Sequence, residues 1–214
     1  MSYTCRGGKV LNNAVVHETQ VGEGDGDDLW HSPASREQVL NVLSNFHPTA
    51  QKIVNMANED GIVVHHLFKR PALPSFTRGR TVVVGDAAHV MLPSHAAAGG
   101  IAIESAATLE VLFRDVHGKD METVRERMEL FDQLRVPRCN LTMFASNAGP
   151  RWLDVPGVEQ DIRRFYKGPL PPRGALPWST PFRKLLFHHN EFDAAEKALA
   201  SFEDGNGTLG RVRN

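Results

Sequence analysis

The segment from Val82 to Glu104 combines residue types that suit ligand binding. An apolar run ends at Gly85 and is followed by Asp86, so the pattern predicts a strand with a carboxylate at its carboxyl end, where open α/β sheets bind ligands. Small residues at 96–100 then open a predicted helix, whose free N–H groups and macrodipole favour an anionic ligand edge. The segment therefore indicates a site for a ligand with hydroxyl groups and an anionic edge. The alternative is an ordinary strand–loop–helix corner with Asp86 as a turn residue.

Histidines supply the other candidates for chemistry. His95, in the loop before that helix, is a weak candidate for a general acid or base. His89 is better explained as a packing and hydrogen-bonding residue than as a base. We predict no metal site, because His65-His66 and His188-His189 are adjacent pairs whose side chains would point to opposite faces of a strand.

Composition excludes several classes of protein. The 214 residues carry 24 Lys and Arg against 25 Asp and Glu, so no excess of positive charge favours nucleic acid or an anionic membrane. Two cysteines cannot make a disulfide framework and suit a reducing compartment. No apolar run is long enough for a membrane span, and the first residues lack the apolar segment of a signal peptide. We therefore expect a cytoplasmic protein.

Periodicity predicts the elements that must position these residues. The class is mixed, α+β or α/β, since strands come first and helices follow. The apolar strand Thr81–Val84 is expected to be buried on both faces. The helix from Gly99 is expected to bury one stripe, formed by Ala102, Ala106, Leu109, Phe113 and Val116. The other predicted strands cover 9–17 and 61–70, and the other helices begin at the Ser35 capping box, at Pro48, at Met121 and at Glu191.

The central segment resembles a known flavin motif. Gly85-Asp86-Ala87-Ala88-His89, then Pro93, then Ala102-Ile103-Glu104 are similar to the second flavin-binding motif of FAD-dependent aromatic-ring monooxygenases, in particular the salicylate-hydroxylase-like branch. The resemblance implies that Asp86 binds the ribityl chain of FAD and that Pro93 lies beside the isoalloxazine ring. It also implies that amides around 98–100 face the pyrimidine edge. The implied cofactor-binding residues are Gly85, Asp86, Pro93, Ala98, Gly99 and Gly100, and no catalytic residue follows beyond the weak candidate His95.

The resemblance also implies a domain division. Tyr3–Gly8 resembles a strand of the family's substrate domain, and Phe192–Glu196 resembles its C-terminal helix. We therefore expect a partial substrate-domain-like region at 1–80, the Gly-Asp strand and long helices at 81–148, and a Pro-rich connection with a short helix at 149–214. The implied fold is a truncated flavoprotein monooxygenase fold with a partial substrate-domain sheet.

Two departures from the family pattern stand beside the match. Family members are about twice as long and begin with a Rossmann unit, in which a Gly-x-Gly-x-x-Gly between a strand and a helix binds the FAD pyrophosphate; no predicted strand of this sequence is followed by that pattern. In addition, Ala96-Ala97-Ala98 replaces the family's Gly-x-Gly, and each alanine adds a methyl group and disfavours positive φ. We therefore expect that the adenine and pyrophosphate site cannot be formed by this chain alone.

Three functions stay open on these grounds. The first is part of an FAD-dependent monooxygenase for a small aromatic or polyketide- or terpenoid-like substrate, with FAD as cofactor, NAD(P)H as candidate reductant and no redox competence as an isolated chain. The second is a cofactor-independent isomerase or cyclase of secondary metabolism that reuses the substrate pocket. The third is a non-catalytic remnant, or a subunit whose apolar face is covered by a separate FAD-binding chain or by self-association.

Overall fold

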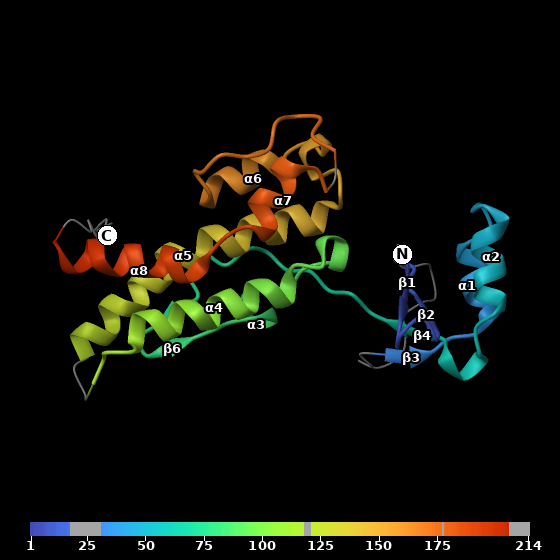
Figure 1. Cartoon of the computed structure of the whole chain (residues 1–214), viewed down its shortest axis with the longest axis horizontal. Coiled ribbons are helices and arrows are strands. Elements are labelled where there is room, and N and C mark those ends of the chain that lie inside the picture. Colours follow the sequence, from blue (N-terminus) through green and yellow to red (C-terminus); the bar gives the residue numbers. More distant parts are fainter. Residues whose placement is uncertain (18–30, 118–120, 177, 206–214) are drawn as a thin grey trace. The chain divides into compact units, whose positions relative to one another are not determined.

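The computed structural model describes residues 1–17, 31–117, 121–176 and 178–205 (Figure 1). The chain divides into two compact units, Met1–Leu67 and Phe68–Asn214. The three-part division at residues 80 and 148 stays a prediction.

The first unit contains two small antiparallel sheets and a pair of short helices. Strand β1 (Ser2–Cys5) pairs with β2 (Val10–Asn13), and β3 (His31–Pro33) pairs with β4 (Val63–His65). The predicted capping box is confirmed, because the Ser35 hydroxyl accepts a hydrogen bond from the Gln38 amide while the Gln38 side chain accepts one from the Ser35 amide. These bonds begin α1 (Arg36–Val42), Pro48 begins α2 (Pro48–Asn55) as predicted, and a short 3₁₀ turn, η1 (Glu59–Gly61), follows.

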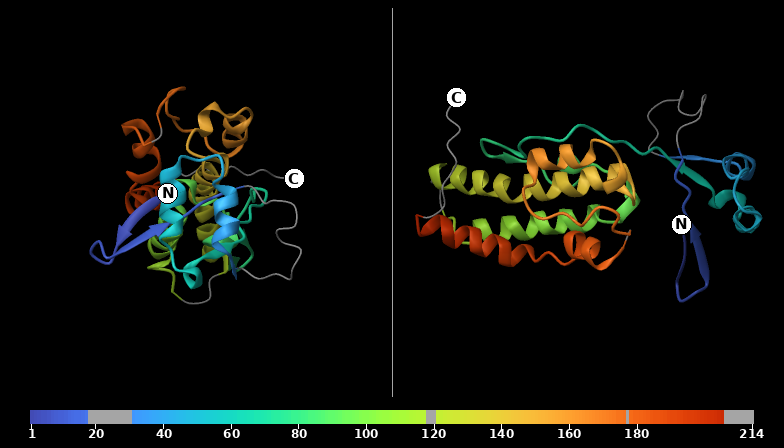
Figure 2. Two further views of the ribbon diagram at one scale, coloured as in Figure 1. Left: turned by 90° about the vertical axis from the view of Figure 1, so that its right-hand side faces the viewer. Right: turned by 90° about the horizontal axis from the view of Figure 1, so that it is seen from above.

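The second unit is dominated by helices. Figure 2 shows α4 (Ala98–Phe113), α5 (Met121–Ala148) and α8 (Glu191–Glu203) side by side. A two-stranded hairpin precedes them, and its strands are β5 (Thr77–Arg78) and β6 (Thr81–Val82). The Asp132 carboxylate on α5 holds this hairpin, accepting hydrogen bonds from the Phe76 amide at 2.8 Å and from the hydroxyls of Ser75 and Thr77. The remaining elements are α3 (Asp86–His89), η2 (Pro93–His95), η3 (Trp152–Asp154), α6 (Val158–Phe165) and α7 (Thr180–Phe187).

Two apolar clusters form the core of the second unit. The first lies between the hairpin, α4 and α5 and is centred on Phe76, Ile101 and Phe131. The second lies between the end of α5, α6 and α7 and is centred on Trp152 and Phe182. No helix of the described residues combines the length and the apolar character needed to cross a membrane.

Several details of the predicted elements were wrong. The strands predicted at 9–17 and 61–70 are only four and three residues long. The strand at Thr81–Val84 is not buried on both faces, since among the described residues β6 pairs only with β5, and Val84 is 41% exposed. Helices α6 and α7 were not predicted, although the spacing of Val158, Ile162 and Phe165 marks one face of α6.

The buried stripe of α4 was also assigned to the wrong residues. Ala106 is exposed, and the other four predicted residues are only half-buried. The helix instead buries Ile101, Ser105, Thr108 and Leu112, together with Val111. The reason is that two of these residues are polar and take part in a buried hydrogen-bond network, which a search for apolar periodicity does not detect.

Candidate functional site

The turn between β6 and α3 requires glycine. Gly85 has φ +60° and ψ −143°, a backbone conformation that L-residues rarely adopt. A Cβ atom at this position would lie 3.9 Å from the Cβ of Ala102, so the turn packs against the second turn of α4. Asp86 follows as the first residue of α3 and is exposed. This arrangement presents an exposed carboxylate beside α4.

The amino end of α4 is open. Among the described residues, no side chain caps this end by a hydrogen bond, and no acidic residue lies in the first turn. Gly99 and Gly100 are exposed, and a Cβ atom at either would meet no atom within 4 Å. Ala98 and Ala102 are four residues apart and so share one face of the helix. Because Gly85 packs against Ala102, the Gly85–Asp86 turn lies about one helical turn from the open end.

The loop between these elements is held in an unfavourable conformation. Pro93 is exposed and begins η2, and the following Ala96 lies in the left-handed region with φ +50° and ψ 32°. Left-handed backbone costs a non-glycine residue about 1–2 kcal/mol. The substitution of alanine for a glycine of the family pattern therefore falls at a residue where glycine would be less strained.

His95 and His89 are both enclosed. His95 is 1% exposed, with ring centroids of Phe182 at 5.0 Å and Trp178 at 6.2 Å, and burial lowers its pKa to about 4. His89 is fully buried near Phe76, and burial lowers its pKa as well. No ring nitrogen of either residue has a hydrogen-bond partner within the described ranges. Both rings are therefore neutral near pH 7, and the hydrogen bonds predicted for the His89 ring are not seen.

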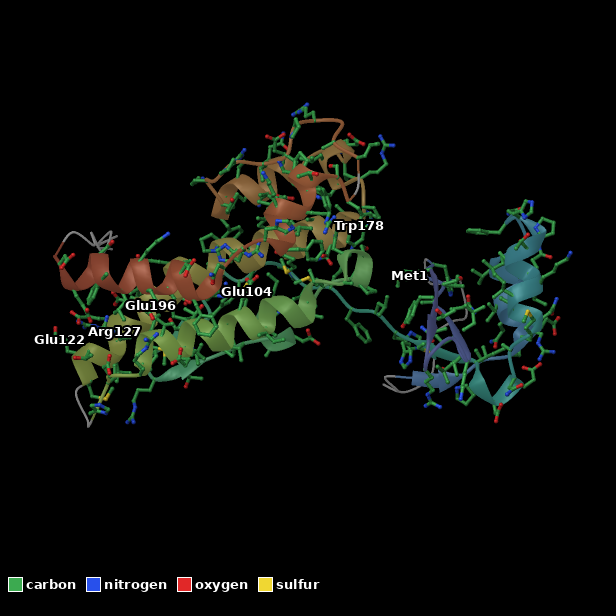
Figure 3. All side chains as sticks on the ribbon, in the orientation of Figure 1. Met1, Glu104, Glu122, Arg127, Trp178 and Glu196 are labelled. Carbon is green, nitrogen blue, oxygen red and sulfur yellow. The ribbon has the colours of Figure 1, made fainter. Side chains whose placement is uncertain are left out.

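The middle of α4 carries a network of buried charges. Arg135 of α5 is fully buried and donates to Glu191 of α8, to Glu104 of α4 at 3.0 Å and to the Ile101 carbonyl at 3.0 Å. Its Nε also donates to the Ser105 hydroxyl at 3.2 Å. Figure 3 shows Glu104 on α4, in the region where α5 and α8 lie beside it. One guanidinium thus joins three helices.

A second arginine completes the network. Arg138 donates to both oxygens of Glu104, at 3.1 and 2.9 Å, and to the carbonyl groups of Leu185 and Leu186 at the end of α7. Burial alone would raise the pKa of the Glu104 carboxyl, but the hydrogen bonds and charges of Arg138 and Arg135 outweigh it and lower that pKa. Glu104 is therefore ionised, and α7 is tied to α4 and α5.

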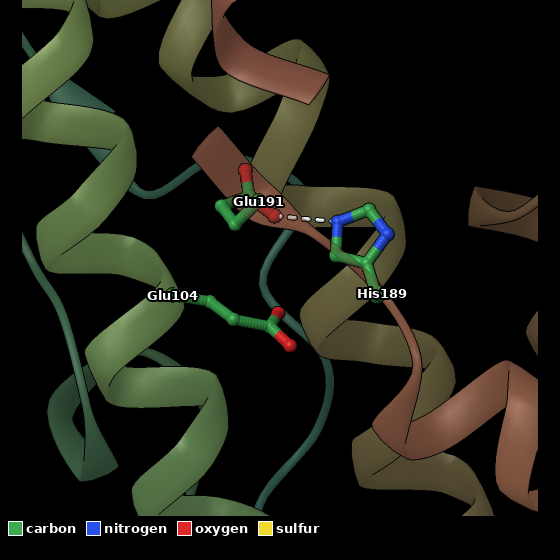
Figure 4. Close-up of side chains that lie close together, drawn as sticks. All are labelled: Glu104, His189 and Glu191. Atoms are coloured by element: carbon green, nitrogen blue, oxygen red, sulfur yellow. Dashed lines mark hydrogen bonds and ion pairs between the residues drawn. The ribbon is translucent and has the colours of Figure 1, made fainter. Parts of the chain in front are cut away.

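The network ends at His189, one of the adjacent histidines for which the sequence predicts no metal site. Figure 4 shows His189 beside Glu191, with its Nε2 at 2.7 Å from the carboxylate. The adjacent pair His188-His189 does not lie on a strand, because it connects α7 to α8. Potential ligand atoms of Glu104, His189 and Glu191 lie within 4.8 Å of one another. Apolar spacing could not identify Glu191 or Ser105; the available signal in the sequence was the presence of Glu104, Ser105 and Thr108 within the otherwise largely apolar helix α4.

Comparison with known proteins shows which proteins this chain is related to. No protein-family model matches the chain. The FAD-dependent monooxygenase cfoG of Aspergillus candidus is 24% identical over 99% of this chain and 47% of its own length. The FAD-dependent monooxygenase phomE' of Diaporthe leptostromiformis is 30% identical over 77% of this chain and 40% of its own. The chain is a homologue of FAD-dependent monooxygenases.

The fold agrees with this relationship. The match to the solved structure titled "Salicylate hydroxylase substrate complex" covers 92% of this chain and 46% of the salicylate hydroxylase chain. The TM-score is 0.65 at 20% sequence identity, which shows a shared fold. The predicted resemblance and the mixed, partial monooxygenase fold are thereby confirmed. This homologue of FAD-dependent monooxygenases spans less than half of the length of each of the three proteins.

Proposed function

We propose that this chain forms the isoalloxazine and ribityl side of the flavin site of an FAD-dependent monooxygenase. The observation that supports this most strongly is the position of the Gly85–Asp86 turn, which packs against Ala102 about one helical turn from the open end of α4. The two halves of the flavin motif are therefore neighbours. Exposed glycines with free space around them offer a surface that a flat ring can approach.

Each predicted residue has a role in this proposal. The Asp86 carboxylate accepts hydrogen bonds from ribityl hydroxyls, and Gly85 permits the turn that presents it. Pro93 lies beside the ring, and the backbone amides of 98–100 face its pyrimidine edge. A flavin bound there supplies the redox chemistry for hydroxylating a small aromatic or apolar substrate, with NAD(P)H as the candidate reductant. His95 is enclosed and neutral, which supports a role in holding η2 rather than in proton transfer.

The adenine and pyrophosphate of FAD need residues outside this chain in the proposal. The one Gly-x-Gly-x-x-Gly in the sequence, at residues 205–210, follows helix α8 and does not link a strand to a helix, and the relatives cfoG and phomE' are about twice as long as this chain. A dinucleotide-binding partner chain would supply that side, and the apolar face left without it would be covered by that partner or by self-association. The competing proposal of a cofactor-independent isomerase or cyclase is supported by Ala96 and Ala98, whose methyl groups narrow the space through which a flavin ring would approach the backbone.

Titration with flavins of different length tests the proposal. The folded chain should quench the fluorescence of riboflavin and FAD with similar dissociation constants, and AMP should not compete. Asp86→Ala should weaken both about tenfold, since a hydrogen bond to a charged group contributes about 1.5–3 kcal/mol. Asp115→Ala, at an exposed position beyond the other end of α4, is the matched control and should change nothing.

Two results would contradict the proposal. A folded chain that binds neither flavin would favour the cofactor-independent enzyme, and retained binding in Asp86→Ala would remove the role of that carboxylate. Much tighter binding of FAD than of riboflavin would show that this chain also binds the adenine and pyrophosphate portion.

A further inference from the structure

A cleft of about 520 Å³ opens in the second unit, away from the residues discussed for flavin. It lies between α5, the Pro-rich connection and the segment from α7 to α8, and none of the predicted cofactor-binding residues lines it. Its volume falls in the range of small-molecule pockets in proteins, about 300–1,000 Å³. One wall is apolar and stiff, and includes Leu134, Pro137, Tyr166, Pro171 and Leu185.

The polar end of this cleft holds a histidine in one orientation. The Glu191 carboxylate is 5% exposed, and it accepts hydrogen bonds from the Thr108 hydroxyl at 2.7 Å and from Arg135. Because the Glu191 carboxylate pairs with the Arg135 guanidinium and acts as an acceptor, the His189 Nε2 at 2.7 Å from it carries a proton and donates it. The Nδ1 atom of His189 is then an acceptor. No described residue donates a hydrogen bond to it.

The charges around the cleft select the ligand. Glu191 is the single carboxylate among its lining residues, and Arg135 neutralises it. Arg138 is likewise neutralised by Glu104. Lys184 also lines the cleft, and no carboxylate within the described part of the chain pairs with it. The charge that remains uncompensated is therefore positive.

A metal ion does not suit this end of the cleft. Glu104, His189 and Glu191 have suitable atoms within 4.8 Å of one another, but both carboxylates already accept hydrogen bonds from guanidinium groups. A divalent cation would have to displace these donors and lie beside two arginine charges, which Coulomb repulsion opposes. An anion meets no such repulsion at this end of the cleft, because Lys184 carries a positive charge and His189 carries no negative charge.

We propose that this cleft binds a small organic acid, with its ring-sized apolar body against the proline-lined wall and its acidic group at Lys184 and His189. Lys184 pairs with the anion, and on binding the His189 Nδ1 takes up a proton from solvent and donates a hydrogen bond to the anion. Glu191 acts as a positioning residue, because it fixes the orientation of His189. The proposal is independent of flavin binding, because the two sets of residues do not overlap.

Isothermal titration calorimetry of the full chain with 1-naphthoate and with its neutral analogue 1-naphthylmethanol tests the proposal. Naphthoate should bind about tenfold more tightly than the alcohol, the difference expected for one charge-assisted contact. Lys184→Met should remove most of that difference while leaving the affinity for the alcohol unchanged, and His189→Gln should weaken the binding of naphthoate. Lys197→Met, at an exposed position of α8 outside the cleft lining, is the matched control and should bind naphthoate as the unmodified chain does.

Nitrogen chemical shifts of the histidine rings give a second readout. Naphthoate should shift the His189 resonances and leave those of the buried His95 unchanged. If His189→Gln does not fold, Lys184→Met and these shifts decide the matter, since Lys184 is exposed. Equal affinity for both naphthalene compounds, or naphthoate binding that Lys184→Met does not weaken, would overturn the proposal, as would absence of binding at millimolar concentrations.

Discussion

The first turn of α4 and the two turns that follow it differ in whether their polar groups have hydrogen-bond partners. In the first turn, backbone amides lack a capping side chain among the described residues, and Gly99 and Gly100 are exposed. A few residues later, Glu104, Ser105 and Thr108 are enclosed and hydrogen-bonded to α5 or α8. The same helix is thus open at one end and fixed in its middle.

The difference separates two requirements of a binding site. Orphan amides at a helix end can be left for a ligand only if something else holds the helix in place. Here the guanidinium of Arg135 does so, because it contacts α4 and α8 from α5. The middle of α4 therefore supplies stability and the first turn supplies the ligand-facing groups.

Replacement of Arg135 should cause the largest loss of stability, because Arg135 fixes the middle of α4. Arg135→Met leaves the buried Glu191 without its cation, and breaking a buried pair in this way costs about 3–5 kcal/mol. Arg125→Met is the matched control on the same helix. Arg125 is 64% exposed, so its ion pairs contribute no more than about 1 kcal/mol. Urea denaturation of both variants measures the difference. Equal stability losses would show that the network does not fix α4.

The dependence of stability on pH tests whether burial lowers the pKa of His95, in the loop before α4. The His95 pKa is lowered to about 4, from an ordinary value of 6.5 in the unfolded chain. Between these values the unfolded chain binds one more proton, so stability rises with pH by about 1.4 kcal/mol per pH unit. This contribution is complete above pH 6.5 and is lost as the pH falls toward 4.

His95→Leu should remove this part of the slope in denaturation curves recorded from pH 4 to pH 7. His117→Leu, at an exposed position after α4, is the control and should keep the slope of the unmodified chain. His89, whose pKa is also lowered, contributes in the same direction and is present in both variants. An unchanged slope in His95→Leu would mean that His95 is accessible to protons in the folded chain.

Helix α4 also shows which features of the structure could be predicted from the sequence and which could not. The residues 85–104 were sufficient to predict the family relationship, because glycine and aspartate at fixed spacing depend on local backbone geometry. Ser35 and Pro48 predicted helix starts for the same reason. The network of Arg135, Glu104 and Glu191 was missed, because its partners are 31 and 56 residues apart along the chain. Burial of a charge depends on such distant partners, and apolar periodicity does not reveal them.

The strand at residues 81–84 illustrates a second reason. An apolar run predicts burial only if other strands or helices cover both of its faces, and within the described part of the chain β6 pairs with a single strand, β5. The prediction of a strand was right. The elements that would cover its faces come from other segments of the chain, and the local sequence pattern does not specify them. The roles of Asp86, Pro93 and 98–100 in flavin binding stay predictions for the same reason.

Substitution of Gly85 tests the turn that presents Asp86. Gly85→Ala should cost about 1–3 kcal/mol, because an alanine would have to adopt φ +60° and ψ −143°. Gly99→Ala is the matched control at the open end of α4, where a Cβ atom meets free space. It should be neutral or stabilising by up to about 1 kcal/mol, the helix propensity difference between the residues. Thermal denaturation measures both, and a neutral Gly85→Ala would show that the turn tolerates another conformation.

The smallest effect is expected at Ala96, between the open turn of α4 and the enclosed His95. Ala96→Gly relieves the left-handed backbone at φ +50°, but a glycine also loses more conformational entropy on folding. The net gain in stability should be about 0.5–1 kcal/mol, measured by thermal denaturation. Ala97→Gly is the control, since Ala97 has φ −103° and should only lose stability. A gain at Ala96 alone would show that the loop before α4 is strained by this side chain; equal losses in both variants would show that the left-handed turn is well tolerated by alanine.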